Sequence, residues 1–150
     1  MKMQSKSLSI VIVFATLYPA LTLGLYPVSY GQVQIRISDA LYPLIGLFGF
    51  PALLGCVIGH AIANLFSPLG IIDMMSVLFF VPAKIAIWKW KFKGVPLHVL
   101  SVALWVPYIL HLLFGVPYLP TVFYVGTGEA VAELILGRWL YLEVERRIGK

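Results

Sequence analysis

A few ionisable and amide side chains stand within or beside long apolar runs of this sequence, where they could bind a polar ligand. The first is Glu129, which follows Gly126 and Gly128, and such small residues let a ligand or a neighbouring backbone approach closely. A charge at the centre of a bilayer costs roughly 2.5–3.5 kcal/mol or more, so a carboxylate there needs a partner or a function. Glu129 is therefore the first candidate for ligand contact.

Four further polar residues are expected in the same half of the membrane as Glu129. Asp73 opens one apolar run, Asn64 closes the run before it, and Gln34 and Arg36 lie in the loop after the first run. Their carboxylate, amide and guanidinium groups offer both hydrogen-bond donors and acceptors. Together the five residues predict a substrate-binding pocket that opens to the outside.

Each of these loop and helix-end residues also has an ordinary structural explanation. Asp73 could cap its helix by accepting bonds from free N–H groups. Asn64 with Ser67 could end the preceding helix, and Arg36 could anchor the chain at the outer interface. These alternatives stay open from the sequence alone.

The composition excludes a soluble domain. Of the 150 residues 61% are hydrophobic and 11% are charged, whereas a soluble domain carries about 25% charged residues. No Walker A, H-E-x-x-H or G-x-S-x-G pattern is present, so the sequence predicts neither an ATPase nor a hydrolase. The lone Cys56 predicts no disulfide, and the sequence predicts no metal site and no cofactor. His60, His98 and His111 are scattered over apolar segments, and we interpret them as packing or hydrogen-bonding residues.

The apolar runs predict one integral membrane domain over residues 1–150. Each run is continuously apolar rather than alternating, which favours helices over the strands of a barrel. The residues Gly49, Phe50 and Pro51 favour a tight turn between the second and third helices. The expected fold is an all-α bundle of six transmembrane helices, at approximately 8–28, 40–50, 51–66, 71–88, 97–114 and 121–142.

The basic residues predict the orientation of this bundle in the cell membrane. With six spans, eight Lys and Arg residues fall on the side of the two termini, whereas the outer loops hold only Arg36. This asymmetry obeys the positive-inside rule and predicts cytoplasmic termini in a multi-pass protein. Basic clusters between apolar runs favour membrane anchoring over nucleic-acid binding. The eight residues are Lys2, Lys6, Lys89, Lys91, Lys93, Arg146, Arg147 and Lys150.

Two more features suggest contacts within or beyond the bundle. Lys84 and Glu133 are expected at similar depth, and we interpret them as an ion pair that braces two helices. Thr16, Ala20 and Gly24 form a stripe of small residues on the first helix. Such a stripe lets helices approach closely, either inside this bundle or against another membrane subunit.

Several segments resemble a known transporter family. Ala15–Thr22 and Gly31–Asp39 are similar to the start of QueT-type proteins, and Gly55–Asp73 is similar to their most diagnostic motif. Val125–Glu129 resembles the family's signature on the sixth helix. The combination of Q-x-R-x-S-[DE] with A-N-L-x-S-P-x-G-x-x-D is specific, and the resemblance covers most of the chain.

The resemblance implies a non-enzymatic substrate-binding subunit, or S component, of an energy-coupling-factor importer. Such a subunit works with a transmembrane coupling subunit and two ATPases, and the small-residue stripe matches its docking face. The QueT branch implies a queuosine precursor, a 7-deazaguanine, whose two adjacent donors a carboxylate can accept bidentately. Glu129 is the first choice for that contact and Asp73 the second.

Other assignments stay open. Asn64 and Gln34 could bind the remaining edges of the ring, and Arg36 could close the loop over it. Tyr42, Tyr124 and Trp105 are the candidate stacking platforms. The alternatives to this function are an S component for another vitamin-like ring compound and a stand-alone proton-coupled carrier. The carrier would use Glu129 and Glu133, which share a helix face at i and i+4.

Overall fold

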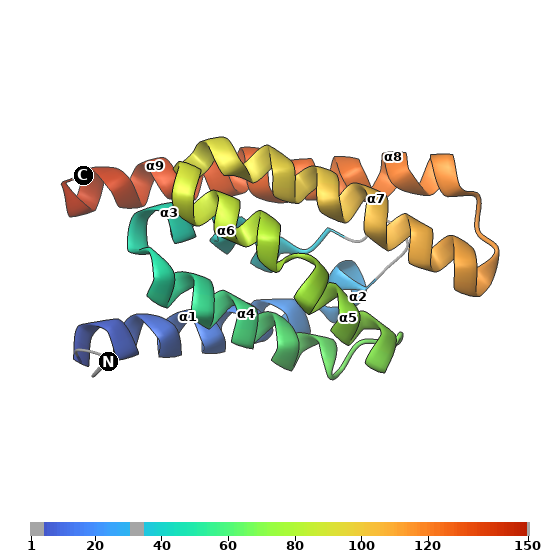
Figure 1. The fold of residues 1–150 in the computed structure, drawn as a ribbon, viewed down its shortest axis with the longest axis horizontal. Coiled ribbons are helices and arrows are strands. Elements are labelled where there is room, and N and C mark those ends of the chain that lie inside the picture. Colours follow the sequence, from blue (N-terminus) through green and yellow to red (C-terminus); the bar gives the residue numbers. More distant parts are fainter. Residues whose placement is uncertain (1–4, 31–34, 150) are drawn as a thin grey trace.

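The fold of this chain is helical throughout the part that the structure describes. The structure is a computed structural model that describes residues 5–30 and 35–149, and these residues contain no strand. Figure 1 shows the helices running along one common direction. The prediction of an all-helical fold is therefore confirmed for the described residues.

The helices follow the expected apolar runs closely. The bounds are α1 Ser5–Gly24, α2 Tyr26–Ser29, η1 Ile37–Leu44, α3 Ile45–Phe48, α4 Phe50–Asn64, α5 Ile71–Phe79, α6 Val81–Trp90, η2 Lys91–Gly94, α7 Val95–Phe114, α8 Tyr118–Ala130, η3 Val131–Leu136 and α9 Gly137–Ile148. The first expected run corresponds to α1 and α2, the second to η1 and α3, and the third to α4. The fourth run corresponds to α5 and α6, the fifth to α7, and the sixth to α8, η3 and α9. The short segment η2 reverses the chain between α6 and α7, and η3 is a turn and a half of π-helix.

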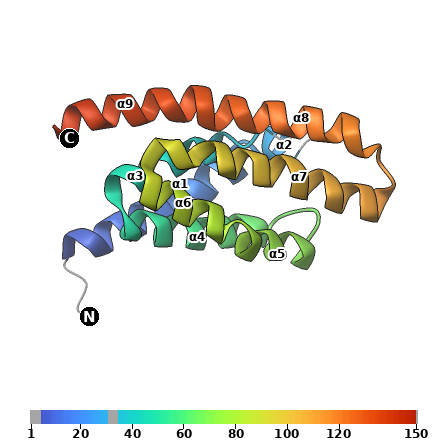
Figure 2. The same cartoon turned by 45° about the horizontal axis from the view of Figure 1, so that its top comes forward.

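Three helical segments in the described residues are long and apolar enough to cross a bilayer. They are Ser5–Gly24, Ile71–Phe114 and Tyr118–Ile148, and the second of them reverses at η2. Two shorter apolar segments, Ile37–Phe48 and Phe50–Asn64, lie beside them. The beginning of α1 and the end of α9 lie at the same end of the bundle in both views (Figures 1 and 2).

The turn predicted around Gly49 is confirmed. Gly49 has φ +71°, which side-chain-bearing residues rarely adopt, and it separates α3 from α4. Pro51 stands in the first turn of α4, where its missing N–H costs no helical hydrogen bond. The chain therefore enters α4 directly after a tight reversal.

Glycines on α4 allow α1 to approach closely. An added Cβ at Gly55 would lie 2.6 Å from the Val11 carbonyl oxygen and 2.7 Å from the Phe14 Cβ. One at Gly59 would lie 2.8 Å from the Tyr18 Cβ. The bulky face of α1 thus packs on the small face of α4.

The stripe of small residues on α1 faces away from this contact. Thr16, Ala20 and Gly24 are all exposed, and an added Cβ at Gly24 would meet no atom within 4 Å. The stripe therefore does not pack inside the described bundle, which removes one of its two explanations.

We predict that Gly55→Ala destabilises the protein while Gly24→Ala does not. The new methyl group at position 55 would collide with the backbone of α1, and such overpacking costs about 1–3 kcal/mol. At position 24 the space is open and alanine favours the helix. Thermal unfolding in detergent gives the melting temperature of both variants. A melting temperature of Gly55→Ala at or above the wild-type value would contradict the close α1–α4 contact.

Candidate functional site

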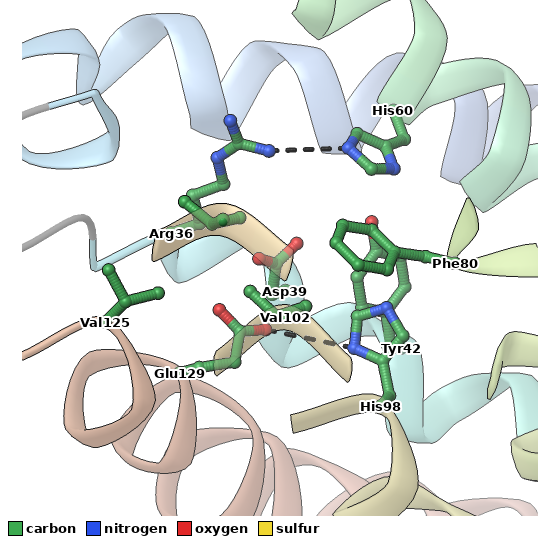
Figure 3. Close-up of a pocket in the computed structure, with 10 residues that line it drawn as sticks. Arg36, Asp39, Tyr42, His60, Phe80, His98, Val102, Val125 and Glu129 are labelled. Atoms are coloured by element: carbon green, nitrogen blue, oxygen red, sulfur yellow. Dashed lines mark hydrogen bonds and ion pairs between the residues drawn. The ribbon is translucent and has the colours of Figure 1, made fainter. Parts of the chain in front are cut away.

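A small cavity lies in the middle of the bundle, between η1, α4, α7 and α8. Its volume is about 10 Å³, close to the space that one water molecule requires. Polar and aromatic side chains from these segments point toward it (Figure 3). The lining residues are Arg36, Asp39, Tyr42, His60, Phe80, His98, Val102, Val106, Val125 and Glu129.

Glu129 supplies the open hydrogen-bond acceptor of this cavity. The residue is 1% exposed, and its Oε1 atom has no hydrogen-bond partner among the described residues. The nearest ion-pair partner is the His98 Nδ1 atom at 3.9 Å (Figure 3). A buried acceptor without a partner costs about 1–3 kcal/mol, so the position favours a ligand that donates a hydrogen bond.

Glu133 lies one turn further along and contacts a different residue from the one we predicted. Its Oε1 atom is 2.5 Å from His98 Nδ1, whereas Lys84 Nζ lies 2.8 Å from His60 Nδ1 and 4.5 Å from the centre of the Tyr42 ring. No ion pair joins Lys84 to Glu133 in the described part of the chain. The predicted Lys84–Glu133 brace is therefore wrong, because depth along a helix does not specify which face the side chain occupies.

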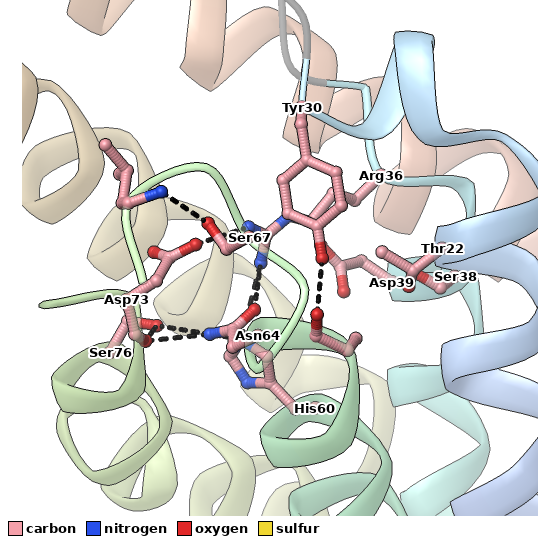
Figure 4. A network of polar contacts seen from close by, with 12 residues as sticks. Thr22, Tyr30, Arg36, Ser38, Asp39, His60, Asn64, Ser67, Asp73 and Ser76 are labelled. Atoms are coloured by element: carbon pink, nitrogen blue, oxygen red, sulfur yellow. Dashed lines mark hydrogen bonds and ion pairs between the residues drawn. The ribbon is translucent and has the colours of Figure 1, made fainter. Parts of the chain in front are cut away.

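A second group of polar residues lies between the cavity and the end of α4. The Arg36 guanidinium donates to the Asp73 carboxylate at 3.3 Å and to the Asn64 Oδ1 atom at 3.5 Å (Figure 4). It also lies 3.3 Å from His60 Nε2. The structure thus brings together three of the five residues that the sequence singled out.

The surroundings of Arg36 favour its charged form. Burial alone would lower the pKa of Arg36, but the oxygens of Tyr18 and Asp73 outweigh burial and raise that pKa above its ordinary value. The guanidinium therefore stays a cation at the edge of the cavity.

Asn64 and Asp73 are held in place by contacts between α4 and α5. The Asn64 Nδ2 atom donates to the Asp73 backbone carbonyl at 2.7 Å and lies 3.1 Å from the Ser76 hydroxyl. The Asp73 side chain makes no capping bond at the start of α5 and instead accepts from Arg36. Capping is therefore not the role of Asp73 in this structure.

A wider cleft, the outer cleft, lies beyond the Arg36–Asp73 ion pair as seen from the cavity. Its volume is about 510 Å³, and Tyr30, Asp73 and Tyr124 are among its lining residues. Asp73 borders this cleft and Arg36 borders the inner cavity. The ion pair therefore stands between the two spaces.

The other predicted residues differ in their positions. Gln34 lies outside the described residues. Tyr42 lines the inner cavity and Tyr124 the outer cleft, whereas Trp105 stacks on Phe79 with ring centres 4.0 Å apart. The three candidate platforms therefore belong to different places.

Sequence reasoning did not assign several members of the site. Asp39 accepts a bond from the Tyr18 hydroxyl at 2.5 Å, and its place in the Q-x-R-x-S-D motif could have indicated it. His60 and His98 were interpreted as packing or hydrogen-bonding residues, and both indeed make buried polar contacts. The spacing of the two histidines along the sequence could not predict that they line the cavity, because each contacts a partner on a different helix.

Comparison with known protein families supports a membrane protein. Neither the curated proteins nor the solved structures that were searched gave a match. One family model, described as QueT transporter, matches residues 8–146, which is nearly the whole chain. This multi-pass membrane protein belongs to the QueT transporter family.

Proposed function

We propose that this transporter is the substrate-binding S component of an ATP-driven energy-coupling-factor importer, and that it takes up a queuosine precursor of the 7-deazaguanine type. The observation that carries the proposal is the buried, unpartnered Oε1 atom of Glu129 at the wall of a cavity. Family membership supports transport rather than enzymatic activity.

The chemistry of the cavity suits the edge of a deazaguanine ring. The ring presents two adjacent N–H donors, which the Glu129 carboxylate can accept, and a carbonyl oxygen that can accept from Arg36. Tyr42 and Phe80 give the cavity aromatic walls. Asn64 and Asp73 do not line the cavity; they accept hydrogen bonds from Arg36 and hold it at the edge of the cavity.

Entry of such a ring requires the inner cavity to widen. Ligand pockets typically measure about 300–1,000 Å³, far more than the roughly 10 Å³ of this cavity. The outer cleft is large enough and adjoins it through the Arg36–Asp73 ion pair. The proposed route of the substrate therefore runs from the outer cleft past this ion pair.

The proposed topology has six spans and both termini in the cytoplasm. The beginning of α1 and the end of α9 lie at the same end of the bundle, as an even number of crossings requires (Figure 1). The cluster Lys89, Lys91 and Lys93 lies at the reversal between α6 and α7, and Arg146 and Arg147 lie near the end of α9. Basic residues on that side support its cytoplasmic orientation.

The proposed partners are a transmembrane coupling subunit and two ATPase subunits. The chain carries no nucleotide-binding pattern, so an ATP-driven importer needs its motor from other polypeptides. Thr16, Ala20 and Gly24 are exposed and small, which allows another helix to pack closely against α1.

A stand-alone proton-coupled carrier is the second candidate function. Glu129 and Glu133 are both buried one turn apart, and both lie near His98. Buried carboxyl groups of this kind occur in proton pathways of transporters. This candidate predicts uptake by the chain alone in a proton gradient, without ATPase subunits.

We predict that Glu129→Gln weakens the binding of 7-deazaguanine at least tenfold. Glutamine keeps the size of the side chain but removes the charge-assisted acceptor, which contributes about 1.5–3 kcal/mol. Isothermal titration of the full chain in detergent measures the affinity. Glu143→Gln on α9, where the carboxylate pairs with Arg146 and Arg147, is the matched control. Equal affinity of Glu129→Gln and the wild type would refute the role of Glu129.

We predict that Asp73→Asn accelerates both association and dissociation of 7-deazaguanine. The substitution removes the ionic partner of Arg36 but leaves the backbone carbonyl that Asn64 contacts, so the α4–α5 contact persists. Stopped-flow fluorescence measures both rates. Unchanged rates would show that the ion pair does not separate the outer cleft from the cavity.

We predict that Thr16→Leu and Ala20→Leu prevent copurification of the coupling and ATPase subunits while the variants still fold. A leucine on this face keeps a partner helix from close approach. Thr127→Leu on α8 is the matched control, because both threonines are exposed and both hydroxyls bond to the carbonyl four residues earlier. Affinity purification followed by mass spectrometry measures the assembly. Intact complexes with both stripe variants would place the docking face elsewhere.

A further inference from the structure

The geometry points to a metal site at the inner wall of the cavity: we propose that His98, Glu129 and Glu133 bind one divalent transition-metal cation. Histidine and carboxylate side chains are common ligands of such ions. One ligand atom of each residue lies within 4.8 Å of those of the other two. The three residues come from α7, from the end of α8 and from η3.

The three side chains are buried and only partly satisfied. Their side-chain exposures are 1% for His98, 2% for Glu129 and 0% for Glu133. Within the described residues, Glu129 Oε1 and Glu133 Oε2 have no hydrogen-bond partner. Each such oxygen is costly to bury, and in the substrate-free protein a cation between the carboxylates would give both of them a partner.

The nearby basic side chains make their direct contacts to other residues. Arg36 pairs with Asp73, and Lys84 contacts His60 and the Tyr42 ring. Two carboxylates and a neutral imidazole therefore form a ligand set whose charge a single divalent cation balances. Balanced charge matters here because an uncompensated ion in a membrane interior is expensive.

Local structure holds the ligands in a fixed arrangement. The π-helix η3 begins directly after the last turn of α8 and contains Glu133, and π-helical turns frequently occur at functional sites. The His98 ring packs at a steep angle against Tyr42 and Phe80, with ring centres 4.6 Å and 5.5 Å apart. Rigid positioning of this kind is what a metal site requires.

The donor set also selects among metal ions. One imidazole nitrogen and two carboxylates suit zinc, manganese, iron or cobalt, whereas magnesium and calcium prefer oxygen ligands alone. The cavity beside His98 and Glu129 has room for about one water molecule, which can complete the coordination. The sequence predicted no metal site because no histidine has a ligand at metal-binding spacing along the chain, and the fold supplies the missing proximity.

Metal titration of the full-length protein tests the site. Protein purified in detergent, freed of its affinity tag and treated with EDTA, is titrated with Zn²⁺ and Mn²⁺ by calorimetry. We expect one ion per chain, and at least tenfold weaker binding for Glu133→Gln and His98→Gln. Mg²⁺ should bind far more weakly than either ion.

Matched variants separate this site from surface binding. Glu143→Gln and His111→Asn remove a carboxylate and an imidazole from more exposed positions on α9 and α7, and both should bind the ions as the wild type does. Binding of Co²⁺ gives a separate readout, because its visible absorption reports coordination directly.

Two results would overturn the proposal. One is a wild-type protein that binds none of Zn²⁺, Mn²⁺ and Co²⁺, in which case the glutamates are neutralised by protons. The other is ion binding that Glu133→Gln and His98→Gln leave unchanged. Because the wild-type titration alone gives the first result, the test does not depend on the folding of either variant. It also needs no deazaguanine, so its outcome is independent of the proposed substrate.

Discussion

A bilayer offers no water to an unpaired polar group, and this constraint explains the arrangement of the buried polar side chains. Arg36 contacts Asp73 and Lys84 contacts His60, and in both cases the two residues come from different segments of the bundle. Each pair therefore helps to fix how the helices face one another. Beside these contacts, the open Oε1 atom of Glu129 is informative, because folding alone does not require an unpartnered acceptor at the wall of the cavity.

Local features of the sequence predicted the helices and part of the site. Hydropathy and the Gly49 turn act over a few residues, so the helical segments of the structure follow the expected apolar runs. Asn64 and Asp73 converge with Arg36 because consecutive apolar helices return their connecting ends to the same side. The sequence order of the elements was therefore enough to predict that meeting.

The remaining contacts depend on the rotation of each helix about its own axis. Glu133 and Lys84 have similar depth, but Glu133 faces His98 on α7 while Lys84 faces His60 on α4. An apolar helix gives little indication of which face turns inward, since both lipid and core favour the same residues. His98 was consequently interpreted as an ordinary packing residue, although it contacts the most buried carboxylates of the site.

The cost of leaving a buried polar group unpaired also gives the proposed pocket its selectivity. A ligand must pass the ion pair between Arg36 and Asp73 and then occupy a cavity bounded by Glu129. A ring that lacks donors would leave the carboxylate buried and unpaired, and sites that hydrogen-bond their ligand reject such analogues strongly. A ring with two donors and an acceptor gives hydrogen-bond partners to both Glu129 and Arg36. Discrimination in this proposal therefore rests on the cost of the unpaired carboxylate, more than on the shape of the cavity walls.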